Sequence, residues 1–202
     1  TPMINVAAIR MQQFGVQFYQ ASLTASDIDK LVRFEVLNYG DAAQSGVRGG
    51  RPRPGGAPSK VNWDLLERRI ASSEKAYQRQ IIRRKIDELV QYYEQCRQAR
   101  DLPSIPGAVI ITCDERLSFL PSAEDGRVGI LKVPEREGIL RAIDGQHRLA
   151  ALRFYLKEHP QEASSINVPC VIFDGRSEDF AAEMFVIINS TTTRISKSHL
   201  ID

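Results

Sequence analysis

The residues best suited to chemistry in this chain form one short run, Asp144–Arg148, with the sequence DGQHR. The run lies between an apolar stretch that ends at Ile143 and an amphipathic stretch, which predicts a turn from a strand into a helix. The N-terminus of such a helix carries unpaired backbone N–H groups and a partial positive charge. Gly145 would let an anion approach those groups closely, while His147 and Arg148 add hydrogen-bond donors. The run therefore predicts a phosphate-binding turn.

Asp144 adds a negative charge at this turn, and a carboxylate would repel a bound phosphate. Two interpretations stay open. The side chain caps the helix as its N-cap residue, or it holds Mg²⁺, which would turn the repulsion into a bridge. From the residues alone, a capped helix start explains the run about as well as a binding site does.

A second polar run, Asn189–Thr193, follows a helix that Ser177 is expected to cap. Short amide and hydroxyl side chains can complete the shell of a phosphate or of Mg²⁺. The plainer interpretation is a helix C-cap at Asn189 followed by a polar turn. Glu183, earlier in that helix, would either orient a metal-bound water or face solvent.

Positive charge gathers in one part of the chain, although the 202 residues carry 27 Lys and Arg against 25 Asp and Glu, a net +2. From Arg48 to Arg100 there are 13 basic against 6 acidic residues, a local +7. Such an asymmetry is a possible footprint for DNA, and a solvated helix face is the alternative. The candidate DNA contacts are Arg68, Arg69, Arg83, Arg84 and Lys85.

The elements that position these residues follow from the apolar pattern. Strands are expected at Ile4–Arg10, Gly15–Leu23, Ala108–Thr112, Val128–Val133, Ile139–Ile143 and Val168–Phe173. Helices are expected from a cap at Ser26 to Phe34, and at Trp63–Ser73, Ile82–Arg100, Gln146–Glu158 and Ser177–Ile188. Strands mixed with helices indicate an α+β (mixed α/β) fold.

One domain spanning residues 1–202 fits this length and composition. We expect a flexible loop rich in Gly, Pro and Arg at residues 40–60, followed by a basic helical segment at 61–100. The chain begins without Met and ends within what reads as another element, so we expect it to be a fragment of a longer protein.

Several classes of protein are disfavoured. No apolar run approaches the roughly 20 residues of a membrane-spanning helix. Cys96, Cys113 and Cys170 form no CxxC pair, so we expect reduced thiols, a cytoplasmic location and no membrane association. The histidines and cysteines lack zinc spacing, and no GxSxG, GxxxxGK[ST] or GxGxxG motif is present.

The string DGQHRLAAL, followed by FVIINSTTTRISKSHL, resembles the DGQHR-domain family of DndB-like proteins. The best-known members of this family are encoded with the genes for DNA phosphorothioation, a sulfur modification of DNA, and related proteins accompany other DNA-modification and phage-defence systems. The resemblance continues upstream through AYQRQIIRRKIDELVQYY and PGAVIIT, and so covers most of the chain. These proteins in turn look like members of the ParB/sulfiredoxin-like superfamily. The resemblance therefore implies a small mixed sheet with packed helices and a helical insertion.

The resemblance also implies a nucleotide site, because the corresponding turns of ParB-like and sulfiredoxin domains hold nucleotide phosphates. The implied phosphate-binding residues are Gly145, Gln146, His147, Arg148, Asn189, Thr193, Gln78 and Arg79. From the residues themselves, the candidate catalytic residues are Asp144, His147 and Glu183, and the candidate metal ligands are Asp144 and Asn189. Gln146 stands where sulfiredoxins have their reactive cysteine, so sulfinic-acid reduction is not expected.

The leading hypothesis is a DNA-associated, nucleotide-binding regulator of a DNA sulfur-modification, restriction or related defence system. It would bind an NTP, with ATP the first candidate, together with Mg²⁺, and would hydrolyse it slowly. Its partners would be DNA, other DNA-modification proteins and further copies of itself in a homo-oligomer. Two alternatives remain: a DNA-binding transcriptional repressor that uses no nucleotide, and a metal-dependent DNA nickase that uses Asp144 and His147.

Overall fold

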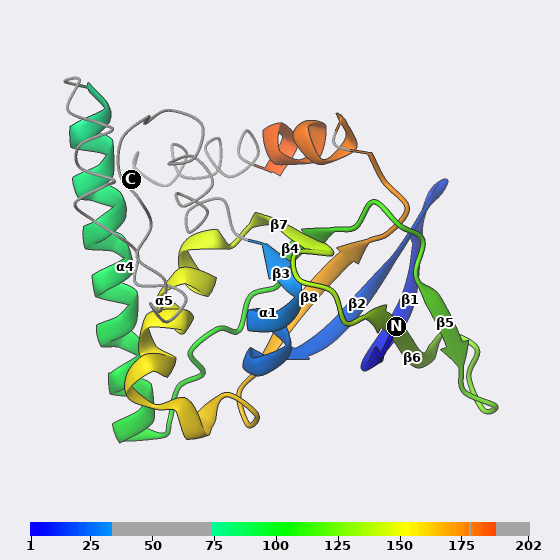
Figure 1. Ribbon diagram of the computed structural model, residues 1–202, viewed down its shortest axis with the longest axis horizontal. Coiled ribbons are helices and arrows are strands. Elements are labelled where there is room, and N and C mark those ends of the chain that lie inside the picture. The colour runs from blue at the N-terminus through cyan, green and yellow to red at the C-terminus, as the bar shows by residue number, and fades with distance from the viewer. Residues whose placement is uncertain (34–73, 178, 189–202) are drawn as a thin grey trace, which may run out of the picture.

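The computed structural model describes residues 1–33, 74–177 and 179–188, and for residues 74–81 it describes the backbone alone. These residues form an α+β fold, as the sequence predicts (Figure 1). The loop expected at 40–60 and the helix expected at Trp63–Ser73 lie outside the described residues. The chain order of the elements is β1 (Met3–Gln13), β2 (Val16–Thr24), α1 (Ala25–Leu31), β3 (Val32–Arg33), α4 (Glu74–Ala99), β4 (Val109–Thr112), β5 (Ser118–Pro121), β6 (Val128–Pro134), β7 (Leu140–Asp144), α5 (Gln146–Glu158), the 3₁₀ helix η1 (Pro160–Glu162) and β8 (Asn167–Phe173), followed by a helix at residues 179–188.

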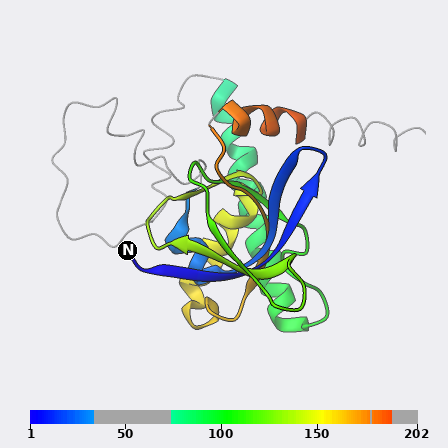
Figure 2. The ribbon, with the colours of Figure 1, turned by 90° about the vertical axis from the view of Figure 1, so that its right-hand side faces the viewer.

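The described strands form one mixed sheet in the order β3-β7-β4-β8-β2-β1-β6-β5. The β3–β7 and β4–β8 pairs are parallel and the other neighbours are antiparallel. Helix α5 lies between the sheet and α4, which packs along its outer side (Figures 1 and 2). Because β7 leads directly into α5, the turn between them lies where the sheet meets the helical layer.

The core fills the space between the sheet and α5. Alternate residues of the strands, such as Val109, Leu131 and Ile172, are fully buried and belong to one core cluster. From α5, Leu149 and Leu152 join the same cluster, and Ala150 and Ala151 are fully buried small residues that let the helix approach closely. Burying apolar surface contributes about 25 cal/mol per Å². This packing therefore fixes the position of the turn that precedes α5.

The sheet curls strongly at its β5 end (Figure 2). The rings of Tyr19 on β2 and Phe119 on β5 lie 5.3 Å apart between centroids, although β1 and β6 separate the two strands. Gly129 allows this approach, because a Cβ there would lie 2.1 Å from the carbonyl oxygen of Leu120. The hairpin of β5 and β6 therefore folds over the open end of the core.

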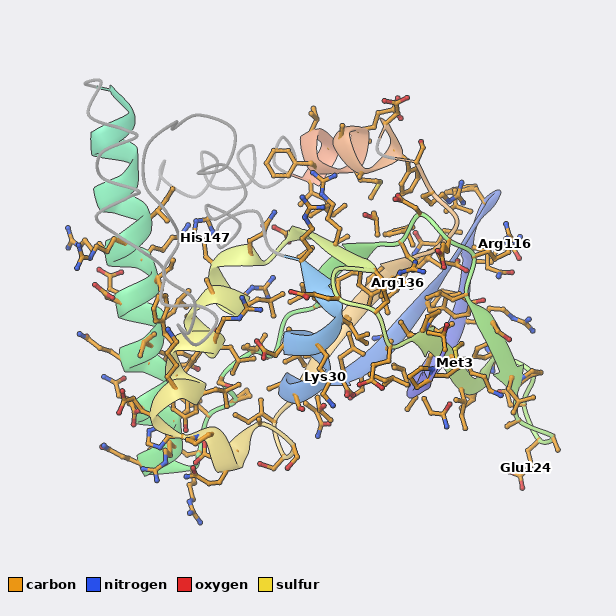
Figure 3. The ribbon with its side chains drawn as sticks, in the orientation of Figure 1. Met3, Lys30, Arg116, Glu124, Arg136 and His147 are labelled. Atoms are coloured by element: carbon orange, nitrogen blue, oxygen red, sulfur yellow. The ribbon has the colours of Figure 1, made fainter. Side chains whose placement is uncertain are left out.

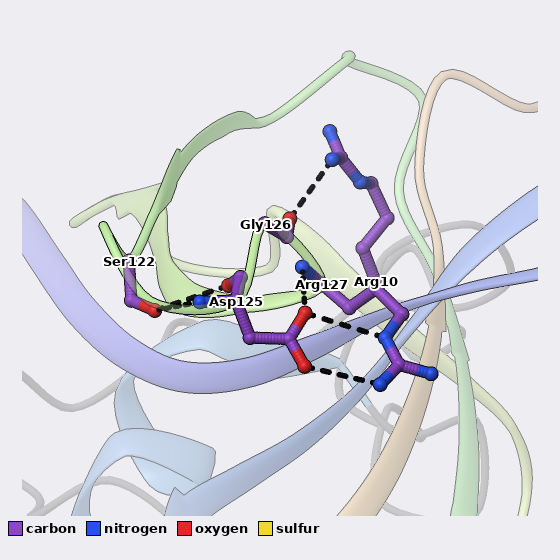
Figure 4. Close-up of polar contacts among 5 residues, drawn as sticks. All are labelled: Arg10, Ser122, Asp125, Gly126 and Arg127. Atoms are coloured by element: carbon purple, nitrogen blue, oxygen red, sulfur yellow. Dashed lines mark hydrogen bonds and ion pairs between the residues drawn. The ribbon is translucent and has the colours of Figure 1, made fainter.

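The tip of that hairpin carries a small polar network that is remote from the DGQHR turn, as the positions of Glu124 and His147 in Figure 3 show. The carboxylate of Asp125 accepts hydrogen bonds from the backbone N–H, Nε and Nη2 of Arg127, at 2.9, 3.3 and 3.0 Å (Figure 4). Arg10 donates to the carbonyl oxygen of Gly126 at 2.9 Å. These bonds fix the hairpin tip against β1.

Both expected boundaries of the first helix differ from the structure. The predicted cap at Ser26 is wrong, because the N-cap of α1 is Thr24, whose Oγ1 accepts a hydrogen bond from the Asp27 N–H at 3.1 Å. The helix also ends at Leu31 instead of Phe34, and the chain continues directly into β3. Ser177, by contrast, caps its helix as predicted, since its Oγ accepts a hydrogen bond from the Phe180 N–H at 3.4 Å.

Helix α4 begins at Glu74, eight residues before the expected Ile82. It ends close to the expected position, where Arg100 takes a left-handed conformation with φ 55° and its N–H bonds to the Cys96 carbonyl oxygen at 2.9 Å. The sequence pattern does not predict β5, which is only four residues long and, among the described strands, pairs only with β6.

The three cysteines form no disulfide in the structure. Burial raises the pKa of Cys113 to about 11 and that of Cys170 to about 12, so both thiols stay protonated at neutral pH. Among the described residues, no helix combines the length and apolar character that crossing a membrane requires.

Candidate functional site

The DGQHR run forms the strand-to-helix turn that its pattern predicts. Strand β7 ends at Asp144, α5 begins at Gln146, and Gly145 between them is the N-cap, with φ 87° and ψ 14°. A Cβ on Gly145 would lie 2.9 Å from Nη2 of Arg148 and 3.0 Å from Cγ2 of Val109. Glycine is therefore required here both by the left-handed conformation and by the space available.

The interpretation of Asp144 as the N-cap of α5 is wrong, because Gly145 occupies that position and has no side chain to cap the helix. The first hydrogen bond of the helical ladder runs from the Leu149 N–H to the Gly145 carbonyl oxygen, at 3.1 Å. The backbone N–H groups of Gln146 and His147 precede that bond and have no acceptor within the helix. They are the donors that an anion at this end of α5 would use.

A cavity of about 630 Å³ lies beside this turn. Figure 3 shows His147 at the start of α5, on the side of α4. The cavity is bounded by α4, by the turn and by the helix at 179–188, and its lining residues are Lys85, Glu88, Leu89, Asp144, Gly145, Gln146, His147, Arg148 and Phe185. The fold therefore brings the DGQHR turn together with a basic residue from a different part of the chain.

His147 is partly buried in this cavity. Burial is the main cause that lowers its pKa, and the positive charge of Lys85 lowers the pKa further. The carboxylate of Asp144 raises it. The imidazole is therefore neutral at neutral pH and can either donate or accept a hydrogen bond. Added negative charge at the site would favour the protonated form.

Arg148 makes contacts that its predicted phosphate role does not require. Its Nη1 and Nη2 donate hydrogen bonds to the carbonyl oxygens of Gly107 and Ala108, at 2.7 and 3.2 Å. Nη2 also lies 3.8 Å from Oδ2 of Asp144. The guanidinium therefore fastens the segment before β4 to the turn, and contact with a phosphate stays a prediction for it.

The backbone of Arg148 links the turn to α4 as well. The hydroxyl group of the buried Tyr93 donates a hydrogen bond to the Arg148 carbonyl oxygen, at 3.0 Å. Burial raises the pKa of Tyr93, so the hydroxyl keeps its proton. The start of α5 is thus joined to α4 by a buried hydrogen bond as well as by the packing of the two helices.

Gln146 borders a second cavity of about 480 Å³. Its amide donates to the Ala142 carbonyl oxygen at 3.4 Å. The lining of this cavity combines one carboxylate and one guanidinium with mostly apolar side chains, and consists of Arg141, Ala142, Ile143, Gln146, Asp179, Ala181, Ala182, Phe185 and Val186. Gln146 and Phe185 line both cavities, so the two are adjacent.

Sequence reasoning missed Glu88, the second carboxylate that lines the larger cavity with Asp144. Glu88 follows Lys85 by three residues and therefore shares its helix face, which was the available signal. It also pairs with Arg84 at 3.1 Å on the exposed side of α4. Glu183, a candidate catalytic residue from the sequence, is exposed and borders neither cavity.

The structure leaves several implied site residues without a description. Asn189, Thr193, Arg68 and Arg69 lie outside the described residues. Gln78 and Arg79 lie on α4, but their side chains are not described. The other candidate DNA contacts, Arg83, Arg84 and Lys85, are consecutive exposed residues of α4.

The described side chains fit a magnesium site in which a bound phosphate supplies part of the ligands. Nowhere in the described part of the chain do three or more His, Cys, Asp or Glu side chains come together as metal ligands. Mg²⁺ is commonly held by one or two carboxylates together with the phosphates of a substrate. Asp144 at the turn fits that shared arrangement, whereas a metal held by protein ligands alone is not supported by these residues.

An uncapped helix N-terminus lies beside a cavity whose lining includes Lys85 and Arg148, next to an exposed basic stretch of α4. These features define an α+β protein with a candidate anion-binding site. The chain belongs to the DndB family, described as DNA-sulfur modification-associated, whose profile matches residues 6–201. This confirms the family that the DGQHR motif suggests, and it makes the protein one associated with DNA sulfur modification. No curated protein and no solved structure matches the chain. The ParB/sulfiredoxin-like relationship therefore stays a prediction.

Proposed function

We propose that this protein is a nucleotide-binding regulator of a DNA sulfur-modification system, and that its DGQHR turn holds the phosphates of an NTP. The observation that carries the proposal is the cavity of about 630 Å³, which combines the uncapped start of α5 with Lys85 and His147. Helix N-termini and nearby cations are the groups that proteins use to hold phosphates. The volume also lies in the range of about 300–1,000 Å³ found for small-molecule sites.

In this proposal the triphosphate neutralises charge on both sides of the cavity. Backbone N–H groups of Gln146 and His147 would donate from α5, and the ammonium group of Lys85 would approach from α4. A bound nucleotide would then hold α4 against the turn, in addition to the hydrogen bond between Tyr93 and the Arg148 carbonyl oxygen. This coupling is the proposed route by which nucleotide affects the rest of the molecule.

Mg²⁺, when bound, would neutralise charge on the phosphates, with Asp144 as its protein ligand. Slow hydrolysis would need a carboxylate that orients an attacking water. Glu88 is the described carboxylate in the cavity besides Asp144, so we assign it the water-orienting position. ATP remains the first candidate nucleotide.

Calorimetric titration with each NTP, with and without Mg²⁺, tests the phosphate site. We expect binding to the wild-type protein and a loss of about tenfold or more in affinity for Lys85→Ala and for His147→Ala. Lys30→Ala is the matched control, because this exposed lysine of α1 borders neither cavity. Absence of NTP binding to the folded wild-type protein would overturn the proposal.

A DNA-binding repressor without nucleotide is the second candidate, favoured by the three consecutive exposed basic residues Arg83, Arg84 and Lys85. It predicts DNA binding that neither ATP nor His147→Ala changes.

A nickase is the third candidate. Glu88 supplies the second carboxylate that it needs near Asp144. Metal-dependent nicking of supercoiled plasmid that is lost in Glu88→Gln would favour the nickase over both other candidates.

A further inference from the structure

The cavity of about 480 Å³ on the other side of Gln146 and Phe185 has no role in the phosphate site. Its walls are mostly small apolar side chains, contributed by the end of β7 and by the helix at 179–188: Ala142, Ile143, Ala181, Ala182 and Val186. A flat aromatic ring is the kind of group that such walls exclude from water. The cavity therefore suits the base of a nucleotide better than it suits its phosphates.

The polar groups of the two cavities support the same division. The larger cavity has two carboxylates, Asp144 and Glu88, but it also has Lys85, Arg148 and the uncapped start of α5, which attract phosphate. The smaller cavity has one cation, Arg141, and one carboxylate, Asp179, among its described lining residues. A triphosphate placed there would meet the Asp179 carboxylate without the helix N-terminus to compensate it.

We propose that the smaller cavity holds the base of the nucleotide and that Asp179 selects bases with an exocyclic amine. This inference rests on the proposed nucleotide site. An ionised carboxylate is a hydrogen-bond acceptor only. It accepts a hydrogen bond from the amine of adenine, whereas the carbonyl oxygen at the same position of hypoxanthine would face it with no hydrogen to donate. Gln146 and Phe185 lie where the ribose would cross between the two cavities.

Competition between ATP and ITP tests the selection, because the two nucleotides differ in that amine and in the protonation of the adjoining ring nitrogen. We expect the wild-type protein to bind ATP about tenfold or more tightly than ITP, the size expected for one hydrogen bond to a charged group. Purine riboside triphosphate, with hydrogen at that position, should rank between them, since it loses the bond without adding a second acceptor. Equal affinities for the three nucleotides would overturn the inference.

Asp179→Asn tests the residue itself. The amide can donate to the carbonyl oxygen of ITP, so we expect the ATP preference to fall to about threefold or less. Glu137→Gln, an exposed carboxylate that borders neither cavity, is the matched control and should keep the wild-type preference. A full ATP preference in folded Asp179→Asn would exclude Asp179 as the selecting residue.

The two proposals fail in different ways. If the wild-type protein binds no NTP, the phosphate site itself is wrong, and the inference about the base falls with it. If ATP and ITP bind equally, the phosphate site stands and only the base selection fails. The comparison of the three nucleotides on the wild-type protein decides the selection even if Asp179→Asn does not fold.

Discussion

Gly145 holds the turn in a backbone conformation that residues with a Cβ avoid, and its neighbours leave no room for one. For Gly145→Ala we expect the free energy of unfolding to fall by about 2 kcal/mol or more. The left-handed conformation alone costs about 1–2 kcal/mol, and Arg148 and Val109 must also shift. Urea denaturation measures the change.

Gly15→Ala is the control for that prediction, because no atom lies within 4 Å of a Cβ built at Gly15. Its effect on stability should stay within about 0.5 kcal/mol. A similar loss for both variants would mean that the DGQHR turn has no special need for glycine.

His147 gives the site a dependence on pH whose sign follows from its surroundings. Burial and Lys85 lower its pKa below the ordinary 6.5 in the free protein, and a bound phosphate would raise it again. We therefore expect ATP binding to take up protons and to strengthen as the pH falls from about 8 to about 6. Calorimetry in buffers of different ionisation enthalpy measures the uptake, and His147→Gln should abolish it.

The same lowered pKa of His147 makes the free protein less stable at low pH, whereas it makes ATP binding stronger there. The unfolded chain binds a proton at His147 more readily than the folded chain does. Protonation below pH 6.5 therefore favours unfolding, and the stability difference between the wild-type protein and His147→Gln should change in that range. Proton release on ATP binding would contradict the first expectation, and a stability difference that stays constant below pH 6.5 would contradict the second.

Among the helices and strands, the sequence predicts best those whose signals lie in adjacent residues, and it misses those that depend on pairing with distant strands. The run into Ile143, the glycine and the amphipathic stretch after it placed β7, the turn and α5 within about one residue, because each signal lies in adjacent residues. Strands β3 and β5 were missed, since two and four residues carry too little periodicity and their pairing depends on distant β7 and β6.

The candidate site shows the same limit. The motif identified the turn, but Glu88, Leu89 and Phe185 enter the cavity only because α4 and the helix at 179–188 are packed there by the core. The charge of Lys85 predicts a DNA contact, and the structure also places this residue in the cavity lining with His147. Spacing along a chain predicts neighbours on one element, and it does not predict which distant elements face each other.

The hydrogen bond from Tyr93 to the Arg148 carbonyl oxygen joins α4 to the start of α5. For Tyr93→Phe we expect a loss of about 1 kcal/mol in stability, because a buried hydrogen bond is lost without a large change in volume. ATP affinity should fall as well, since α4 is then held less firmly at the cavity. Chemical denaturation and calorimetry measure the two effects.

Tyr92→Phe provides the comparison within the same helix. The Tyr92 hydroxyl donates to the Pro103 carbonyl oxygen at 2.8 Å, but this bond is exposed, so water can replace it. Its loss should cost less and leave ATP affinity unchanged. An equal reduction of ATP affinity in both variants would remove the special role of Tyr93.

At the scale of the whole molecule, α4 lies at the opposite end from the β5–β6 hairpin (Figure 1). If the exposed residues Arg83 and Arg84 contact DNA phosphates, replacing both by Ala should make the plot of log affinity against log salt shallower by about 2, since each contact contributes about 0.9. Fluorescence anisotropy with duplex DNA at several salt concentrations measures this slope. Replacing Lys30 and Arg136 removes the same charge away from α4 and should leave the slope unchanged (Figure 3).

Because Lys85 borders the phosphate cavity and directly follows Arg83 and Arg84, the two proposed ligands would act on one helix. A bound triphosphate adds negative charge beside these residues, so we expect ATP to weaken DNA binding by about fivefold or more. Coupling between two binding sites is reciprocal, so saturating DNA should weaken ATP binding by the same factor. Anisotropy with and without ATP, and calorimetry with and without DNA, measure the two factors. Tighter DNA binding in the presence of ATP would show that the nucleotide rearranges α4 instead of only neutralising its charge.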